Sequence, residues 1–496
     1  MTTGLWVFTD GLGLILDPNV LLMLAIGVIA GIIAGALPGL TATMAVAVMI
    51  PLTYHMSPVA AFALLIGTWL SAIFGGSIGA ILINIPGTSA AIMTTLDGYP
   101  MAKSGEAGRA IGIATVCSFV GGLVSAVFLA LFAPVVALWA LGFGSWEYAA
   151  LAIFGLGMVV YISPSIPKGI LAGLFGLLLS TIGTDPMTAF PRYVFGQAYL
   201  LNGLELVPVM IGLFGLAEVL AVLERQVGTM KPIEQVSRVF PSFLELRRLL
   251  PTILRALPVG LVVGVTPAAG PTIATITAYG LEKRFSRQPE RFGKGAPEGI
   301  AAAETANNAS TGGDMVPMMT LGIPGDAVTA VLIGALLLHG LRPGPQLFME
   351  HRDVVSAIFL LMILANIGFL VVGLAGCRLF VQILKTPLNI LIPTIGVLMV
   401  VGTFAIRNSV FDVGVLLLLG GLGYLMGKVN VATAPVILGL ILGPMLESNL
   451  RRALVIAGGD PSTFFLRPVS ALLLLATVLL LSSRAMLACW TRWRAR

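Results

Sequence analysis

The stretch GGDMVPMMTLGIPGDAVTAVLIGALLLHGL, residues 312–341, is apolar enough to lie in a membrane, yet Gly, Pro, Thr and Asp interrupt its helical pattern. An earlier stretch, GGSIGAILINIPGTSAA at residues 75–91, has the same plan. Each begins with Gly-Gly, continues through a mainly apolar run, and closes on Ile-Pro-Gly followed by a polar residue, Thr88 or Asp326. Two broken apolar segments at corresponding places in two halves indicate the binding site of a secondary transporter.

The composition indicates a membrane protein. Of the 496 residues, 57% are hydrophobic and 10% are charged, whereas a soluble domain carries about 25% charged residues. No Asp, Glu, Lys or Arg occurs between Pro18 and Leu96. Apolar runs of about 20 residues, long enough for a transmembrane helix, recur as far as the C-terminus. Because a helix satisfies its own backbone in lipid, the sequence predicts an all-α polytopic membrane protein.

Charge and motifs exclude several other classes. The net charge of +6 comes from basic residues in connecting loops, which is typical of cytoplasmic loops rather than of a nucleic-acid-binding surface. The N-terminal sequence MTTGLWVFTDGLG lacks a basic region and a cleavage site, so we expect no removable signal peptide. Neither an ATP-binding G-x-x-x-x-G-K-[ST] motif nor a metalloprotease H-E-x-x-H motif occurs. The three cysteines lack metal-ligand spacing.

Further parallels between the two halves predict a duplication. The pattern G-x3-G-x2-P occurs at 31–38 and 260–267, GLGMVV at 155–160 matches GVLMVV at 396–401, and PVMIGL at 208–213 matches PVILGL at 435–440. Because these matches keep the order of the central motif, we expect two structural repeats, inverted, with broken or re-entrant helices. The predicted division is a first transmembrane repeat at 1–225, a basic cytoplasmic linker at 226–250 and a second transmembrane repeat at 251–496.

A break in a membrane helix frees backbone groups, which protein or a water-filled cavity must satisfy. Freed N–H groups at a helix start favour an anion, and freed carbonyls at a helix end favour a cation. Hydroxyl and amide groups at the breaks can hold a carboxylate without a buried Arg. We therefore predict substrate contacts from Asn84, Gly87, Thr88, Ser89, Asn308, Ser310, Thr311 and Gly325.

Residues 296–341 contain four acidic residues and no Lys or Arg. Such a balance suits an anion site only if a co-bound Na⁺ or protons offset the charge. We predict ion-coupling roles for Glu304, Asp314, Thr320 and Asp326. No other metal and no organic cofactor is expected.

Simpler readings stay open. Asp314 and Asp326 follow Gly residues at expected helix starts, where Asp is a favoured N-cap. Asn307 and Asn308 could merely hydrogen-bond across helices. Residues 75–79, GGSIG, match the nucleophile elbow G-x-S-x-G of hydrolases, but that turn requires a strand before it, and here it lies in a helical membrane segment. A hydrolase is therefore disfavoured, and we expect no enzyme activity.

Three segments resemble one family closely: GALPG at 35–39, GGSIGAILINIPGTSAA with DGYPMAKSGEAGRA up to residue 110, and the long segment 297–348. They resemble the large membrane subunit of the tripartite tricarboxylate transporters, and the resemblance covers nearly the whole chain. It implies a multi-pass carrier in the bacterial inner membrane for citrate-like or other organic carboxylates. It also implies an ion gradient as the driving force and two partners, a small transmembrane subunit and a periplasmic solute-binding protein.

The function expected from the sequence is therefore ion-gradient-driven uptake of a tri- or dicarboxylate or related organic acid. The alternative is a stand-alone cation-coupled carboxylate symporter that needs no binding protein. The exact carboxylate and the choice between Na⁺ and H⁺ are left open by the sequence.

Overall fold

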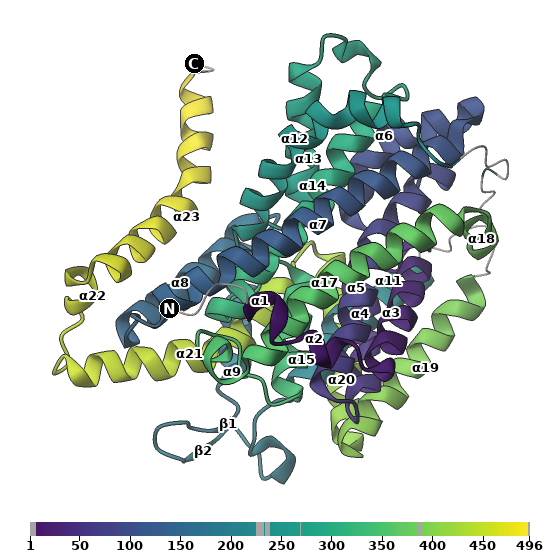
Figure 1. Cartoon of the computed structure of the whole chain (residues 1–496). Coiled ribbons are helices and arrows are strands. Elements are labelled where there is room, and N and C mark those ends of the chain that lie inside the picture. Colours follow the sequence, from purple (N-terminus) through teal and green to yellow (C-terminus); the bar gives the residue numbers. More distant parts are fainter. Residues whose placement is uncertain (1–5, 225–232, 234–238, 268, 385–387, 495–496) are drawn as a thin grey trace. The chain divides into compact units, whose positions relative to one another are not determined.

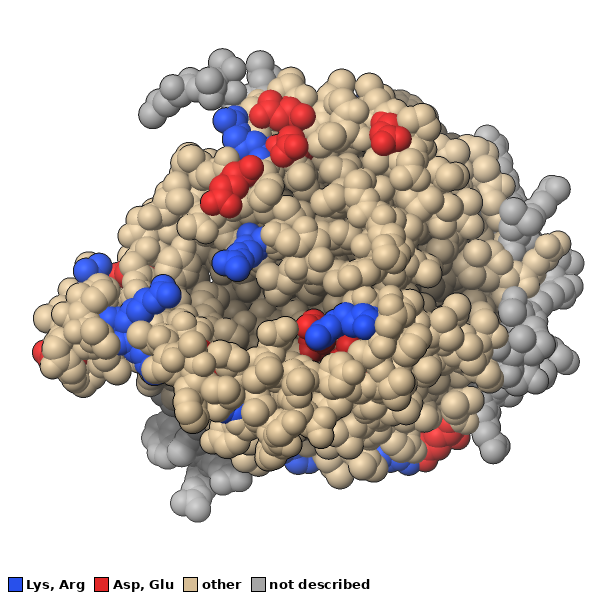
Figure 2. Space-filling view, turned by 90° about the horizontal axis from the view of Figure 1, so that it is seen from below, with Lys and Arg blue, Asp and Glu red and all other residues tan. Residues whose placement is uncertain are grey.

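The computed structural model describes residues 6–224, 233, 239–267, 269–384 and 388–494 (Figure 1). Most of the described chain is helical; the two strands, β1 (Gly183–Thr184) and β2 (Pro191–Arg192), form one short antiparallel pair. Among the described residues, eight helical segments are long and apolar enough to cross a membrane. Most of the surface in Figure 2 is uncharged, with charged side chains in a few separate places. The predicted all-α polytopic membrane fold is confirmed.

The chain divides into two compact units. Unit 1 comprises residues 1–137 and 214–409, and unit 2 comprises residues 138–213 and 410–496. Each unit therefore takes one segment from the first part of the sequence and one from the second. The repeat division at 1–225 and 251–496 stays a prediction.

Unit 1 carries the two broken motifs. Its helices in the first part of the chain are α1 (Trp6–Thr9), α2 (Leu12–Ile15), α3 (Pro18–Ala36), α4 (Ala42–Met49), η1 (Ile50–Thr53), α5 (Pro58–Ile83), η2 (Ser89–Ala91), α6 (Ile92–Met101), η3 (Ala102–Glu106) and most of α7 (Ala107–Ala140). Those in the second part are α11 (Ala217–Glu224), α12 (Phe243–Val265), α13 (Gly270–Phe285), η6 (Pro289–Arg291), α14 (Pro297–Leu321), α15 (Ala327–Leu338), α16 (Leu347–Glu350), α17 (Arg352–Ala375), α18 (Cys377–Ile383) and α19 (Leu388–Arg407).

Unit 2 is smaller. Its elements are α8 (Ser145–Ile162), α9 (Ile166–Ser180), β1, β2, η4 (Ala198–Leu200), α10 (Leu206–Met210), α20 (Val410–Lys428), α21 (Ala434–Ile456), α22 (Thr463–Leu466) and α23 (Pro468–Arg494). The π-helix η5 (Ile211–Leu216) spans the boundary between the two units.

Helix pairs in close backbone contact form the core of unit 1. The stripe Gly27, Gly31 and Gly35 on α3 lies directly against backbone carbonyls of α5, and a Cβ at Gly31 would collide with the carbonyl oxygen of Thr68. On α12, a Cβ at Gly264 would likewise collide with the carbonyl oxygen of Ser310 on α14. Small residues permit this approach between membrane helices. The i, i+4 spacing of the three glycines in the sequence predicts this close packing, which is confirmed, and α12 packs on α14 in the same way.

Several boundaries differ from those expected. The apolar pattern predicts a span over 58–74, before the first Gly-Gly pair, but α5 continues to Ile83. The charged stretch 282–294 is predicted to be a loop, but α13 ends only at Phe285. The linker predicted at 226–250 lies partly outside the described residues, and from Phe243 onward the chain is already α12. The helices α4 and α13 were not predicted, because each is short and follows a Pro break.

Candidate functional site

Both motifs break their helices in the same manner. α5 ends at Asn84, which has the left-handed backbone conformation with φ 58°, and α14 ends at Gly322 with φ 71°. Gly and Asn are the residues that adopt this helix-ending conformation most easily. Ile-Pro-Gly follows in each copy, and its proline cannot continue a helix. The chain then starts a second helix, η2 and α6 after the first break and α15 after the second.

After each break the chain folds back along the helix it has just left. The N–H of Gly87 donates to the carbonyl oxygen of Gly76 at 3.3 Å, and a Cβ on Gly87 would collide with the carbonyl oxygen of Gly35 on α3. In the second copy, a Cβ on Gly325 would lie 2.5 Å from Cα of Asp314. The Gly-Gly pairs therefore lie inside α5 and α14 and do not begin a helix: Gly76 leaves room for Thr88 of the returning chain, whereas Gly312 and Gly313 lie against Ser125 on α7 and Gly264 on α12.

The capping alternative applies to only one of the two aspartates. Asp326 is the N-cap of α15, and its carboxylate accepts from the N–H and the hydroxyl of Thr329, both at 2.7 Å. Asp314 was expected at a helix start, but it lies within α14, more than four residues from either end. The reason is that Gly312 and Gly313 stay helical where α14 packs against its neighbours. Capping therefore does not explain Asp314.

The two breaks meet at the first turn of α13. The hydroxyl oxygens of Ser89, after the first break, and of Thr272 on α13 lie 3.0 Å apart. At the second break, a Cβ on Gly270 would lie 3.4 Å from Cβ of Asp326. The starts of three helical segments, η2 with α6, α13 and α15, thus lie together within unit 1. Their N-terminal backbone groups and dipoles favour an anion there.

Buried polar atoms without a partner are frequent on the same elements. Neither carboxylate oxygen of Asp314 has a hydrogen-bond partner, and the same holds for the hydroxyl of Thr88 and the side-chain oxygen of Asn308. The amide of Asn307 lies near Glu304, but neither of its polar atoms makes a hydrogen bond of good geometry. Buried polar atoms are normally paired. Unpaired ones concentrated on α14 and the first break therefore mark a place for a ligand or ion.

Other predicted site residues make hydrogen bonds within their own helix, α14. The hydroxyls of Ser310, Thr311 and Thr320 donate to carbonyl oxygens three or four residues earlier, at 2.7–2.8 Å. The hydroxyls of Thr311 and of Ser125 on α7 also lie 3.3 Å apart. These hydroxyls help to satisfy a helix inside the membrane and can still accept a hydrogen bond.

Glu304 lies away from the breaks. Its carboxylate accepts from the hydroxyls of Thr94 on α6 and Ser118 on α7, and its side chain is fully buried. Ten residues of helix separate it from Asp314, which corresponds to about 15 Å. The structure therefore brings together Gly87, Thr88, Ser89, Asp314, Gly325 and Asp326, and it places Glu304 at a separate helix contact.

Sequence reasoning missed Asp97, which lies within α6. Its buried carboxylate accepts from the hydroxyl of Tyr279 at 2.9 Å and from the backbone N–H groups of Gly293, Gly295 and Ala296 at 2.8–2.9 Å. Ala296 is the N-cap position of α14, so Asp97 caps a helix that lies far away in the sequence. The sequence did contain a signal for this role, because Asp97 is the first charged residue after Asp17 and follows a long uncharged stretch.

Comparisons with known proteins agree with one another. The model of the tripartite tricarboxylate transporter TctA family matches residues 21–438. An uncharacterised 52.8 kDa protein in the TAR-I ttuC′ 3′ region of Agrobacterium vitis is 37% identical over 450 residues, which is 90% of each chain. An uncharacterised protein in the TAR-II ttuC′ 3′ region of the same organism is 38% identical over 215 residues, 43% of this chain and 89% of the relative. No solved structure matches the chain.

The family match extends over both broken motifs and over the elements that place them beside α13. It agrees with the resemblance seen in the motifs and indicates a component of a transport system rather than an enzyme. The chain is a member of the tripartite tricarboxylate transporter TctA family.

Proposed function

We propose that this protein takes up a tri- or dicarboxylate, or a related organic acid, across the bacterial inner membrane. It acts as the large membrane subunit of a secondary transporter, with a small transmembrane subunit and a periplasmic solute-binding protein as partners. The observation that carries this proposal is the meeting of two broken helices at the first turn of α13, with unpaired buried polar groups beside them. Family membership supports the direction of the argument.

The substrate carboxylates would be held by helix starts and neutral side chains. Thr88 and Ser89 at the first break, and Asn308 on α14, supply hydroxyl and amide groups. Gly87 and Gly325 have no side chain, which lets the chain after each break pack directly against the backbone of Gly35 and of Asp314 and keeps the two breaks in place. Hydrogen bonds to a charged group are stronger than those between neutral groups, so the neutral site suffices for an anion.

Asp314 is the residue we assign to the coupling ion. Its carboxylate is fully buried, with neither oxygen paired, and an isolated buried carboxylate is costly unless a proton or a cation neutralises it. Ionisable residues inside the membrane are functional by default. A Na⁺ or H⁺ that binds Asp314 would also offset the charge of the incoming substrate. Asp326, Thr320 and Glu304 are then secondary: Asp326 caps α15, and Thr320 and Glu304 make hydrogen bonds elsewhere on α14.

Uptake of labelled di- and tricarboxylates into proteoliposomes tests the proposal. The protein, reconstituted with its small subunit, should accumulate substrate only when the binding protein is present and a Na⁺ or H⁺ gradient is imposed. Thr88→Val should reduce uptake by roughly tenfold or more, as expected for loss of one buried hydrogen bond to a charged group. Asp314→Asn should abolish the response to the gradient while exchange of internal for external substrate continues.

Each other outcome has a defined meaning. Gradient-driven uptake without any binding protein would replace the tripartite assignment with a stand-alone symporter. Uptake independent of both ions would remove the coupling role of Asp314. A folded, reconstituted protein that moves no carboxylate would refute the proposed function.

A further inference from the structure

Between α9 and α10, unit 2 carries an exposed loop that is rich in aromatic residues. We name residues 183–201 the aromatic loop; it contains β1, β2 and η4. Four large aromatic side chains are exposed on it: Phe190 by 70%, Tyr193 by 58%, Phe195 by 77% and Tyr199 by 55%. An exposed group of aromatic side chains of this kind is typical of a surface that binds another molecule.

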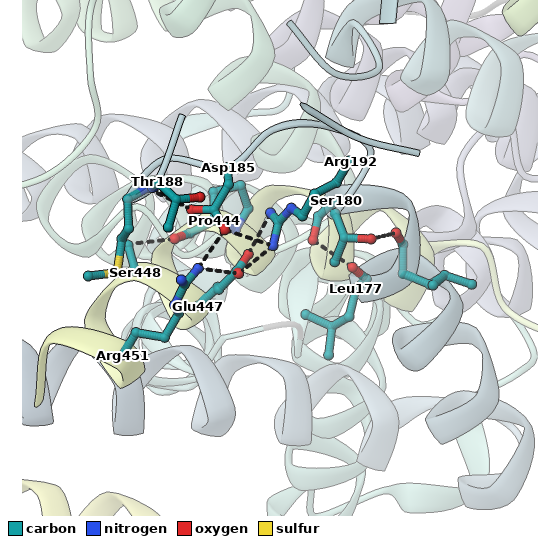
Figure 3. Close-up of polar contacts among 12 residues, drawn as sticks. Leu177, Ser180, Asp185, Thr188, Arg192, Pro444, Glu447, Ser448 and Arg451 are labelled. Carbon is teal, nitrogen blue, oxygen red and sulfur yellow. Dashed lines mark hydrogen bonds and ion pairs between the residues drawn. The ribbon is translucent and has the colours of Figure 1, made fainter. Parts of the chain in front are cut away.

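The loop is fastened to α21 by four charged side chains (Figure 3). Arg192 binds both carboxylate oxygens of Glu447, at 2.6 and 3.0 Å. Arg451 bridges Asp185 at 2.7 Å and Glu447 at 3.0 Å. Asp185 also accepts from the N–H groups of Met187 and Thr188. Bidentate Arg–carboxylate pairs fix geometry as well as adding energy, so the loop is held in one conformation before any partner arrives.

This arrangement leaves an uncharged aromatic face. Asp185 and Arg192 are the charged residues of the aromatic loop, and both are engaged in the cluster with α21. Tyr193 and Phe195 have left-handed backbone conformations, with φ 51° and 47°. Such conformations are costly for large residues and are found where function requires them. Both of these side chains are exposed.

The aromatic loop lies in an aqueous environment and not in the hydrocarbon interior of the membrane. Its backbone is irregular over most of its length, and irregular backbone exposed to hydrocarbon does not occur because its polar groups would lack partners. The ion pairs that fasten it also favour an aqueous setting. The aromatic side chains therefore face solvent or a protein, not acyl chains.

The packing of unit 2 shows which helix termini lie at the same end of the unit. α9 follows α8 after a short turn, and Gly173 on α9 returns to Val160 near the end of α8. α23 starts where α8 starts, since Arg467 pairs with Glu147 at 3.6 Å, and it runs the same way, since Gly157 lies against Thr477. The end of α9 and its aromatic loop therefore lie opposite the end of α23.

The charges assign these two ends to the two sides of the membrane. The described segments at the end opposite the loop, residues 163–168, 428–433 and 484–494, contain five Lys or Arg and no acidic residue. At the loop end, residues 144–147, 183–205 and 447–467 contain four Arg and five acidic residues, and three of these Arg are paired with a carboxylate. An excess of basic residues marks the cytoplasmic side. The aromatic loop therefore faces the extracytoplasmic side.

We propose that the aromatic loop is the docking surface for the soluble extracytoplasmic protein that delivers the substrate. This inference rests on the proposed function, which requires such a partner. A rigid, uncharged group of Phe and Tyr side chains, rimmed by paired charges, has the composition of the centre of a protein interface. It lies on the side from which a soluble delivery protein approaches, and outside the apolar spans against which a membrane-embedded subunit would pack.

A binding measurement on the intact system tests the surface. The full-length protein with its small subunit, in nanodiscs, is titrated with the solute-binding protein of the same transport system. The double variant Phe190→Ser, Phe195→Ser should bind roughly tenfold more weakly or worse, because aromatic anchors dominate interface energies. Phe195→Tyr should bind as the wild type does. The matched control is Phe243→Ser, which changes a Phe exposed by 82% at the start of α12 in unit 1.

The possible outcomes distinguish failure of the docking surface from failure of the proposed transport function. Unchanged binding by the double variant would overturn the docking surface while wild-type uptake still supported the function. The double variant could instead bind the soluble protein as the wild type does, but fail to retain the small subunit or to insert into phosphatidylethanolamine–phosphatidylglycerol vesicles. Either result would overturn the docking surface and assign the loop to a membrane partner. A wild-type protein that transports without the soluble protein would refute the tripartite function itself, whatever the variants do. Failure of the wild type to bind the soluble protein would overturn the docking proposal directly.

Discussion

At the residue scale, Asp97 shows how one buried carboxylate can join two distant segments. It accepts four hydrogen bonds, three of them from the loop that precedes α14. Asp97→Ala would leave the buried N–H of Ala296 and the buried Tyr279 hydroxyl without a partner, at about 1–3 kcal/mol for each, and would also remove the part-buried bonds from Gly293 and Gly295. We expect a loss of about 3–5 kcal/mol in the free energy of unfolding, the upper range for a single substitution, measured by thermal unfolding in detergent.

Tyr279→Phe provides the graded control for this prediction. It removes one donor and leaves the three backbone N–H groups on the carboxylate, so it should cost about 1 kcal/mol. A result in which Asp97→Ala costs no more than Tyr279→Phe would show that the backbone bonds contribute nothing, and the capping role of Asp97 would be wrong.

The residue scale also explains why Gly87 has no substitute. A Cβ there would overlap the carbonyl oxygen of Gly35 and crowd Cα of Gly76, both of them backbone groups that cannot rotate away. Gly87→Ala should therefore abolish uptake and lower the melting temperature, since overpacking typically costs about 1–3 kcal/mol. Gly280→Ala on α13 is the control, because a Cβ at Gly280 meets nothing within 4 Å. Wild-type uptake by Gly87→Ala would mean that the first break moves freely away from α3.

At the scale of elements, the helix breaks depend on residues that tolerate the left-handed conformation. Asn84 ends α5 with φ 58°. Asn84→Gly should preserve stability within a few tenths of a kcal/mol, whereas Asn84→Val should cost about 1–2 kcal/mol, the penalty for a side chain in this conformation. Chemical denaturation of the two variants, compared in one detergent, checks the order. Equal stability of the two would show that the break is set by Pro86 alone.

The ion pairs that fasten the aromatic loop to α21 should make the stability of the protein depend on pH. Hydrogen bonds from Arg451, and then from the N–H of Met187, hold the pKa of Asp185 well below its usual range. A lowered pKa means that the stabilisation is complete above the unfolded value of about 3.9 and is lost as the pH falls through the lowered native value. Below about pH 4 the wild type should therefore lose stability faster than Asp185→Asn, when melting temperatures are followed by scanning fluorimetry. If the melting temperatures of the two proteins fell in parallel with pH, the ion pairs of Asp185 would contribute nothing to stability.

Elements were predictable from sequence where local chemistry decides them. The two breaks follow from Gly, Asn and Pro, whose backbone preferences act without tertiary context, and the α3 stripe follows from its spacing. Asp314 and Asp97 were not predictable in their roles. Asp314 stays inside a helix only because its neighbours pack around Gly312 and Gly313, and the four partners of Asp97 lie about 180–200 residues away in the chain. Tertiary contacts of this kind leave no local pattern.

At the scale of the whole molecule, the two parts of the sequence depend on each other for packing. In unit 2, Gly439 on α21 lies against the backbone of Gly173 and Leu177 on α9, and Gly212 lies against Leu416 and Gly420 on α20. Gly212 and Gly439 hold the same place in the matching PVMIGL and PVILGL motifs. Each of these helices therefore packs against a helix from the other part of the chain. The duplication stays a prediction, but this exchange of packing partners has a measurable consequence of its own.

A chain cut within the linker should function only when both pieces are made together. Residues 1–232 alone lack the partner of η5 on α20, and residues 233–496 alone lack the partner of α21 on α9. Each piece would expose backbone-contact surfaces that small residues have shaped for close approach, so each should be degraded or aggregate when expressed alone. Co-expression should restore a complex that co-purifies through a tag on one piece and takes up carboxylate in proteoliposomes. A single piece that purifies folded and monodisperse would show that the exchange of helices contributes little, and that each repeat is a self-sufficient unit.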